Sequence, residues 1–351
     1  MNQQLKYMNR AYDLALKGWG RTLPNPMVGA VVVKAGKVVG EGWHAFCGGP
    51  HAEVAAFAQA GAKTRGADVY VTLEPCAHFG RTPPCTQAII AAGIKRVFVG
   101  VEDPNSLMRG KSLKFLRKAG IAVEAGFLQE ELTRLNEVFN KYITTRMPFV
   151  TAKIAQTIDG KIAALSGESK WITSQETRDY SRELRFGFDA ILVGINTVLK
   201  DDPGLNAVPQ KPIKKIILDT HLRLPPKAKL FHNSDPQNIF VFTAAKPKKN
   251  YDATIVQSPL RQGHVDLGWV MKYLGQREIS SVLIEGGSQT IGSALAQGLV
   301  DKMMVYIAPK ILGEGLESVR GLKTKKLSQA INLKNISAGR IGEDILLEGY
   351  L

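Results

Sequence analysis

The chain has 351 residues, 44% of them hydrophobic, which suits a globular protein with more than one core. It has no run of eighteen apolar residues, which excludes a membrane-spanning helix, and its three cysteines exclude a disulfide framework and favour a reducing cytoplasm. The net charge of +15 divides almost evenly at Arg146. This is more typical of a solvated surface that attracts small anions than of a nucleic-acid patch.

The first part of the chain alternates helical and strand patterns. The expected elements are a helix over 5–18, a hairpin of strands 28–34 and 38–42, a helix over 51–61, a strand over 69–73, a helix over 84–93, a strand over 96–101, a helix over 111–120, a strand over 121–126 and a helix over 128–145. Strand–helix alternation of this kind predicts an α/β sandwich with a partly parallel sheet.

A second series begins at 147–155, and Pro148 marks the boundary. The patterns predict buried strands over 214–219, 238–243, 253–257 and 281–287, helices over 266–275 and 288–298, and an antiparallel pair formed by 301–312 and 344–351. We therefore expect two α/β domains, residues 1–146 and 147–351.

A candidate zinc site lies in the first domain. His51 and Glu53 stand at the expected start of a helix, Cys76 follows a strand, and Cys85 opens the next helix. A catalytic zinc takes three protein ligands and leaves one position for water, whereas a structural zinc is usually closed by a fourth ligand. His51, Cys76 and Cys85 supply three ligands and Glu53 suits proton transfer, so the set favours a catalytic zinc. Cys47 is interpreted as a spare small residue.

Zinc-dependent deaminases share an H-x-E motif followed by P-C-x-x-C, with zinc activating water and the glutamate moving protons. In this chain eight residues separate Cys76 from Cys85, so the general pattern is only partly met. A nucleic-acid base deaminase and a structural zinc protein are the alternatives. The first would need aromatic platforms and clustered lysines near the site. The second is opposed by the missing fourth ligand.

Several longer motifs resemble the bifunctional riboflavin biosynthesis deaminase/reductase family, in which the wider cysteine spacing is usual. They are PNPMVGAVVV (24–33), GEGWH (40–44), GGPHAE (48–53), VTLEPCAHFGRTPPC (71–85), EDPN (102–105), QTIDGK (156–161), SGESKWITS (166–174), TVLKDDPGL (197–205), EGG (285–287) and VYIAPKILG (305–313). The resemblance covers nearly the whole chain. It implies a cytidine-deaminase-like α/β/α sandwich followed by a domain like dihydrofolate reductase.

For the first domain, the resemblance implies hydrolytic deamination of a diaminopyrimidinone that carries a ribosylamino 5′-phosphate. His51, Cys76 and Cys85 would hold one zinc ion per chain, and Glu53 would carry protons from water to the leaving amine. Asn25 and His44 would lie in the substrate pocket.

For the second domain, the resemblance implies reduction of the ribosyl group to ribityl with NADPH. No G-x-G-x-x-G motif follows a strand, so a Rossmann domain is not expected; IEGGSQTIG (284–292) offers a strand, a glycine pair and a helix start instead. The residues expected near NADPH are Lys153, Ala155, Trp171, Thr197, Asp201 and Gly287. Those expected to face the substrate are Ser169, Arg185, Leu205 and Glu285.

Two departures from the family pattern stand out. Val208 occupies a position where the family usually has an arginine, so either Lys211, Lys214 or another base compensates for it, or the affinity of the reductase is reduced. Arg109 and Ser112 replace small residues in the loop after the fourth strand, which leaves the geometry of that loop open. We further expect a cytoplasmic homo-oligomer that acts on a small phosphorylated pyrimidine, with no nucleic-acid or membrane partner.

Overall fold

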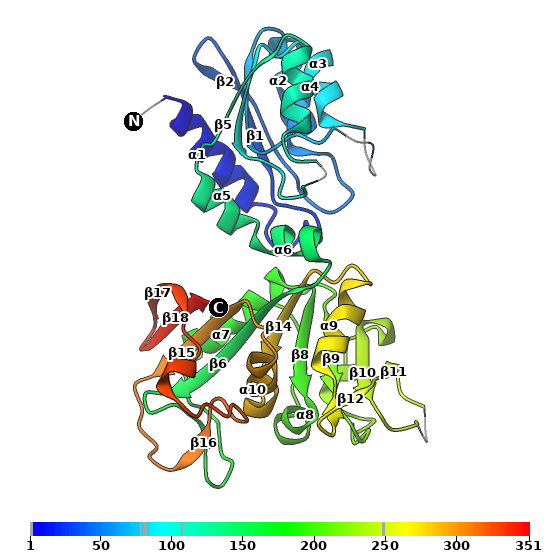
Figure 1. The fold of residues 1–351 in the computed structure, drawn as a ribbon, viewed down its shortest axis with the longest axis vertical. Coiled ribbons are helices and arrows are strands. Elements are labelled where there is room, and N and C mark those ends of the chain that lie inside the picture. The colour runs from blue at the N-terminus through cyan, green and yellow to red at the C-terminus, as the bar shows by residue number, and fades with distance from the viewer. Residues whose placement is uncertain (1–2, 78, 80–82, 107, 248–249) are drawn as a thin grey trace. The chain divides into compact units, whose positions relative to one another are not determined.

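The computed structural model describes residues 3–77, 79, 83–106, 108–247 and 250–351. The chain divides into two compact units, Met1–Arg146 and Met147–Leu351 (Figure 1). Within the described ranges no helix has the length and hydrophobicity needed to cross a lipid bilayer.

The first unit is built on a five-stranded sheet with the order β2-β1-β3-β4-β5. Strand β1 runs antiparallel to β2 and β3, whereas β3, β4 and β5 are parallel. The elements in chain order are α1 (Gln3–Leu16), β1 (Gly29–Lys34), β2 (Lys37–Trp43), α2 (Ala52–Ala60), η1 (Gly61–Thr64), β3 (Asp68–Leu73), α3 (Cys85–Ala91), β4 (Arg96–Val101), α4 (Lys111–Lys118), β5 (Ala122–Ala125), α5 (Gln129–Leu135) and α6 (Glu137–Thr145).

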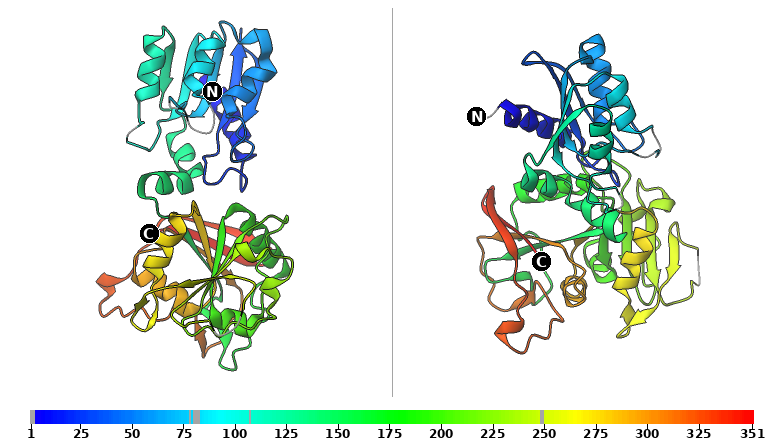
Figure 2. Two further views of the ribbon diagram at one scale, coloured as in Figure 1. Left: turned by 90° about the vertical axis from the view of Figure 1, so that its right-hand side faces the viewer. Right: turned by 45° about the horizontal axis from the view of Figure 1, so that its top comes forward.

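Alternating strand residues bury both faces of this sheet. One face packs against α1 and α5 through a cluster that includes Tyr7, Met8, Val31, Tyr70, Phe98 and Leu132. The other packs against α2, α3 and α4 through a cluster that includes Val32, Ala56, Val69, Ile89, Val99 and Leu116. The strands accordingly lie between two layers of helices (Figure 2). The expected α/β/α sandwich is confirmed.

The helix expected over 128–145 is in fact two helices, α5 and α6, which meet at Asn136. The buried Asn136 side chain accepts a hydrogen bond from the Met27 amide at 2.8 Å and donates one to the Met27 carbonyl at 3.0 Å. These contacts hold the residue at φ −107°, outside the helical region. The break follows from a tertiary contact with a residue more than a hundred positions away, which helical periodicity does not reveal.

The second unit contains a nine-stranded sheet with the order β11-β10-β9-β8-β14-β6-β15-β18-β17. The strands from β11 to β15 in this order are parallel, and β18 and β17 complete the sheet in antiparallel fashion. The helices and sheet strands in chain order are β6 (Phe149–Thr157), α7 (Gln175–Leu184), η2 (Arg185–Gly187), β8 (Ala190–Gly194), α8 (Ile195–Asp201), β9 (Lys214–Leu218), η3 (Lys229–Phe231), η4 (Pro236–Asn238), β10 (Ile239–Thr243), β11 (Thr254–Gln257), α9 (Leu267–Gly275), β14 (Ser281–Glu285), α10 (Ser288–Ala296), β15 (Lys302–Ala308), η5 (Leu327–Gln329), β17 (Lys334–Ile341) and β18 (Asp344–Tyr350).

Two small two-stranded sheets lie outside this order. Their strands are β7 (Lys161–Ala164) with β16 (Gly315–Glu317), and β12 (Leu260–Arg261) with β13 (His264–Val265). The sequence expectations included neither β8 nor the helices α7 and α8. Strand β8 passes directly into α8 at Gly194, so no turn signal separates the two elements.

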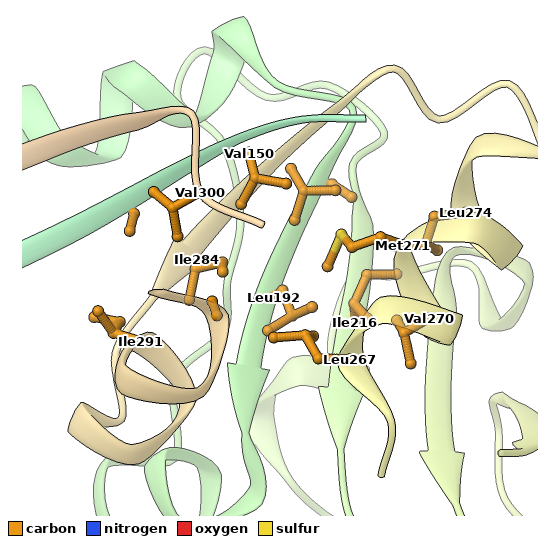
Figure 3. Packing of buried hydrophobic residues seen from close by; sticks show 14 of the residues in the cluster. Val150, Leu192, Ile216, Leu267, Val270, Met271, Leu274, Ile284, Ile291 and Val300 are labelled. Carbon is orange, nitrogen blue, oxygen red and sulfur yellow. The ribbon is translucent and has the colours of Figure 1, made fainter. Parts of the chain in front are cut away.

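The main core of the second unit lies between one face of the large sheet and the helices α9 and α10. Val150, Leu192, Ile216 and Ile284 from four strands pack against Leu267, Val270, Met271 and Leu274 of α9 and Ile291 of α10 (Figure 3). A second cluster, which includes Ile191, Val193, Leu205, Ile217 and Leu230, covers part of the opposite face. That opposite face also carries the charged residues of the second candidate site.

Candidate active sites

The three expected zinc ligands of the first unit lie together in the structure. His51 is the N-cap residue of α2, Cys76 follows β3 by three residues, and Cys85 is the first residue of α3. The His51 Nδ1 atom lies 2.9 Å from Cys85 Sγ and 3.6 Å from Cys76 Sγ. All three ligand atoms lie within 4.8 Å of one another. One zinc ion, with bonds of about 2.0–2.3 Å, fits such a set.

The electrostatics of this cluster also suit a cation. The hydrogen bond from Cys85 and that from His51 lower the pKa of the Cys76 thiol to about 4, although burial opposes the shift. The backbone amide of Cys85 donates a further hydrogen bond to Cys76 Sγ at 3.2 Å. The negative sulfur at Cys76 in turn raises the pKa of the Cys85 thiol. The pair therefore keeps one proton, which a bound metal ion would displace.

Glycines in β2 allow α2 to lie directly against the sheet. A Cβ atom at Gly42 would come within 2.4 Å of the Ala52 carbonyl oxygen, and one at Gly40 within 2.3 Å of the Ala56 carbonyl oxygen. Only glycine permits so close an approach. This packing fixes the first turn of α2, from which His51 and Glu53 project.

Glu53 lies in that first turn and is only 3% exposed. Burial raises the pKa of its carboxyl group, and hydrogen bonding to Cys85 places it beside the ligand cluster. A carboxyl group with a raised pKa can both take up and release a proton near neutral pH. The geometry therefore suits the proton transfer expected of this residue.

Asn25 and His44, the expected substrate residues, contact each other. The His44 Nδ1 atom lies 3.0 Å from the Pro50 carbonyl oxygen and therefore carries the ring proton. Its Nε2 atom then accepts a hydrogen bond from Asn25 Nδ2 at 3.2 Å. Burial lowers the pKa of His44, in agreement with this neutral form. The contact fixes the orientation of the Asn25 amide.

Glu74 is a residue near the site that sequence reasoning missed. Its buried carboxylate accepts hydrogen bonds from the backbone amides of Asp103, Gly110 and Ser112 and from the Ser112 hydroxyl, at 2.7–3.2 Å. Glu74 lies two residues before the expected ligand Cys76. It thus connects this segment to Asp103, Gly110 and Ser112, which follow β4. The signal available in the sequence was a charged residue directly after an apolar strand.

Arg109 and Ser112, the two residues in this region that depart from the family pattern, both have local contacts in the structure. Ser112 is one of the partners of Glu74, and Arg109 forms an exposed ion pair with Glu102 at 2.8 Å. Cys47 is not part of the ligand cluster found among the described residues. Its role as a spare residue stays a prediction.

The second candidate site is a charged cluster on the sheet face opposite α9 and α10. Lys153 on β6 is the register partner of Glu285 on β14. Arg185 of η2 donates two hydrogen bonds to the Glu285 carboxylate, at 2.6 and 2.9 Å, and a third to the Asn206 carbonyl at 2.9 Å. Burial lowers the pKa of Lys153. The cluster offers donors and acceptors to a polyhydroxylated ligand.

The start of α8, directly after β8, and the glycine pair after β14 lie next to each other at the carboxyl ends of these strands. Gly286 and Gly287 have φ values of 98° and 79°, and Gly287 caps α10. A Cβ atom at Gly286 would meet Thr197 Oγ1 at 3.5 Å, and one at Gly194 would meet Thr290 Oγ1 at 2.7 Å. Glycines and hydroxyls at a helix start suit a phosphate-bearing cofactor. The glycine pair and the two threonine hydroxyls therefore fit the phosphate groups of NADPH.

The other expected reductase residues are more dispersed. Ala155 lies two residues beyond Lys153 on β6, and Asp201 ends α8. Trp171 is 58% exposed, and the Arg178 guanidinium lies 4.4 Å from its ring centroid. Ser169 lies two residues before Trp171 on the same irregular segment. The Leu205 side chain is buried in the core, so only its backbone can face a ligand.

Val208 is 47% exposed, and its amide nitrogen donates to the Arg182 carbonyl at 3.4 Å. Of the two lysines expected to compensate, Lys214 donates to Asn238 Oδ1 at 2.6 Å, and the ammonium of Lys211 lies 5.0 Å from the Phe186 ring centroid. Neither contact points to a phosphate, so compensation by these lysines stays a hypothesis.

Two protein families match the two units. The cytidine and deoxycytidylate deaminase zinc-binding region matches residues 1–101, and the RibD C-terminal domain matches residues 148–347. Among curated relatives, the riboflavin biosynthesis protein RibD of Aquifex aeolicus is 47% identical over 97% of this chain and 96% of its own length. The RibD of Escherichia coli is 40% identical over 97% of each chain.

Solved structures agree with these matches. RibD of Acinetobacter baumannii has a TM-score of 0.90 at 37% identity, over 99% of this chain and 98% of its own. A diaminohydroxyphosphoribosylaminopyrimidine deaminase/5-amino-6-(5-phosphoribosylamino)uracil reductase of Thermotoga maritima also has a TM-score of 0.90, at 38% identity and with the same coverage. Fold, motifs and both family matches agree along the whole chain, and the protein belongs to the RibD family of riboflavin biosynthesis proteins.

Proposed function

We propose that this protein catalyses two successive steps of riboflavin biosynthesis. The first is hydrolytic deamination of 2,5-diamino-6-(5-phosphoribosylamino)pyrimidin-4(3H)-one in residues 1–146. The second is NADPH-dependent reduction of the ribosyl group in residues 147–351, giving 5-amino-6-(5-phosphoribitylamino)uracil. The observation that carries the proposal is the cluster of His51, Cys76 and Cys85 with the buried Glu53 beside it, on a chain that also contains a RibD C-terminal domain.

In the deamination, His51, Cys76 and Cys85 would hold zinc. Zinc, when bound, supplies the Lewis acidity that activates a water molecule. The Glu53 carboxylate accepts a proton from that water and returns it to the leaving amine, so that one water is consumed and one ammonia released. Asn25, oriented by His44, presents its amide to the pyrimidine.

In the reduction, Arg185 and Glu285 would bind the ribosyl part of the substrate, together with Ser169 and the Leu205 backbone. Lys153, Ala155, Trp171, Thr197, Asp201 and Gly287 would contact NADPH, which supplies the hydride when bound. The chain positions the two reactants rather than providing a strong acid, since hydride transfer depends chiefly on their alignment. The two hydrogen bonds between Arg185 and Glu285 hold both side chains in fixed orientations, which supports the alignment of the substrate.

We also propose that the enzyme is a cytoplasmic homo-oligomer. Its three cysteines are thiols rather than disulfides, which supports a reducing compartment. Light scattering of the purified protein would measure the oligomeric state, and a monomer at micromolar concentration would contradict the proposal.

The test of the function is a paired assay with the zinc-loaded protein and the diaminopyrimidinone ribosyl phosphate. Ammonia release and NADPH absorbance are followed together. We expect ammonia to appear first and NADPH to be consumed after it. Ammonia without NADPH oxidation would contradict the reductase half, and folded, zinc-bearing protein that released no ammonia would contradict the deaminase half.

A further inference from the structure

A buried lysine, Lys215, lies beside the second site. Lys215 is in strand β9 and is only 2% exposed. Its neighbours on the same sheet face, Ile213 and Ile217, belong to a hydrophobic cluster. Burial of a lysine destabilises the fold unless its ammonium group is fully hydrogen-bonded. The hydrogen-bond partners of the Lys215 Nζ atom therefore indicate the structural role of this residue.

The Lys215 ammonium ties together two separate loops. Its Nζ atom donates to the Gly204 carbonyl at 2.5 Å and to Asn206 Oδ1 at 2.8 Å, both in the loop after α8. It also donates to the Leu230 carbonyl at 2.9 Å and to Ser234 Oγ at 2.6 Å. Burial and, to a smaller extent, the charge of Arg185 lower the pKa of Lys215 to about 8, so the ammonium form persists at neutral pH.

The loop held by Lys215 also contacts Arg185. The Asn206 carbonyl accepts a hydrogen bond from Arg185 Nη1 at 2.9 Å, while the Asn206 side chain is bound to Lys215. Arg185 in turn forms the bidentate pair with Glu285. Lys215, Asn206, Arg185 and Glu285 therefore form one continuous chain of hydrogen bonds from the core to the substrate side of the site.

We propose that Lys215 is a positioning residue of the reductase site. It holds the Gly204–Asn206 loop in the conformation that orients Arg185 for the phosphoribosyl substrate. This inference rests on the proposed reduction and adds a residue that touches neither reactant. A side chain without a charged donor group could fill the space, but it could not supply three N–H donors to the four acceptors that surround Nζ in the two loops.

The inference predicts a selective defect in Lys215→Met, which keeps much of the side-chain volume and removes the ammonium. The probe is 5-amino-6-(5-phosphoribosylamino)uracil, supplied directly so that deamination is bypassed. We expect the KM for this substrate to rise roughly ten- to a hundredfold, because misplacement of a binding group is costly. The KM for NADPH and the rate of ammonia release from the diaminopyrimidinone should stay within about twofold of wild type, because Lys215 itself touches neither reactant.

Lys302→Met is the matched control. Lys302 is a partly buried lysine on strand β15 of the same sheet, but its ammonium pairs with Glu348 on β18 instead of with the loop. This variant should reduce the substrate with a nearly unchanged KM. Equal defects in both variants would overturn the proposal, because they would indicate a general effect of charge or of strand stability.

Asn206→Ala tests the same chain of contacts if Lys215→Met does not fold. It removes one acceptor of Lys215 and keeps the backbone carbonyl that binds Arg185. We expect a smaller rise in the substrate KM, on the order of threefold to tenfold, as the loss of one hydrogen bond gives. A folded variant of either kind with an unchanged substrate KM would overturn the positioning role. Wild-type protein that failed to oxidise NADPH with this substrate would instead refute the proposed reduction.

Discussion

Glu74 accepts two hydrogen bonds from Ser112, one from the backbone amide at 3.2 Å and one from the hydroxyl at 2.7 Å. Its other carboxylate oxygen accepts the amides of Asp103 and Gly110. A single buried carboxylate therefore fixes the loop that follows β4. Because only Pro75 separates Glu74 from Cys76, the same carboxylate also restrains the segment that carries this expected zinc ligand.

Glu74→Gln should therefore weaken both the first unit and its metal site. One carboxylate oxygen would become an amide NH2 group, which cannot accept hydrogen bonds from the backbone amides that face it. Those buried amides would be left unpaired, at a cost of about 2–4 kcal/mol. Zinc affinity, measured by competition with a chelator, should fall by roughly tenfold or more, as it does when groups that support metal ligands are lost. Ser112→Ala removes only the hydroxyl and should cost about 1 kcal/mol. Unchanged zinc affinity in folded Glu74→Gln would contradict the link to Cys76.

Glu53→Gln should separate zinc binding from deamination. The substitution keeps the size of a side chain that is not among the three expected ligands, but it removes the carboxyl group that we propose accepts and returns the proton. Ammonia release should fall by about 10²–10⁴-fold, while the zinc content measured by elemental analysis stays at one ion per chain. Normal turnover in this variant would show that another group moves the proton.

Cys76→Ser should lower the bound zinc, because a serine hydroxyl does not form the thiolate that the site stabilises. Hydrogen bonds from Cys85 and His51 lower the pKa of Cys76, which favours the charged sulfur even before a metal binds. Cys47→Ser is the matched control, since Cys47 is a cysteine of the same unit that lies outside the ligand cluster found among the described residues. A full complement of zinc in Cys76→Ser would remove Cys76 from the ligand set, and loss of zinc in Cys47→Ser would reassign it.

The sequence predicted the first unit better than the second. Strong period-two strands, glycine turns and the HAE and cysteine motifs are local signals, and they located the α/β/α sandwich and the zinc cluster. The contacts that it could not reveal are those between residues far apart in the chain. The break at Asn136 depends on Met27, and the orientation of Arg185 depends on Glu285. Sequence periodicity carries no information about such partners.

Arg185→Ala should impair reduction and spare ammonia release. The substitution removes a guanidinium that binds both Glu285 and the Asn206 carbonyl, and it leaves the Glu285 carboxylate buried without this partner. We expect the kcat/KM for reduction of the deaminated substrate to fall by at least about a hundredfold, and the second unit to be destabilised by about 3–5 kcal/mol. Ammonia release measured on the same preparation is the internal control. Equal damage to both reactions would mean that the whole chain is misfolded.

Glu285 should make the unfolding free energy of the second unit depend on pH in the acidic range. Burial would raise the pKa of its carboxyl group, but the attraction and hydrogen bonds of Arg185 outweigh burial and leave the pKa below its ordinary value of 4.5. A carboxyl group whose pKa is depressed by folding contributes stability above its unfolded pKa and loses it as pH falls through the folded pKa. The contribution should therefore be complete at pH 7 and decline below about pH 4.5.

Urea unfolding of the wild type and of Glu285→Gln, compared at several pH values between 7 and about 3, would measure this dependence. The difference in unfolding free energy between the two proteins should be largest at neutral pH and should shrink as the wild-type carboxylate becomes protonated. Glu314→Gln, which changes an exposed glutamate of the same unit, should give a small difference at every pH. A difference for Glu285→Gln that stayed constant from pH 7 to pH 3 would mean that the carboxylate charge, and hence its pairing with Arg185, does not contribute to folding.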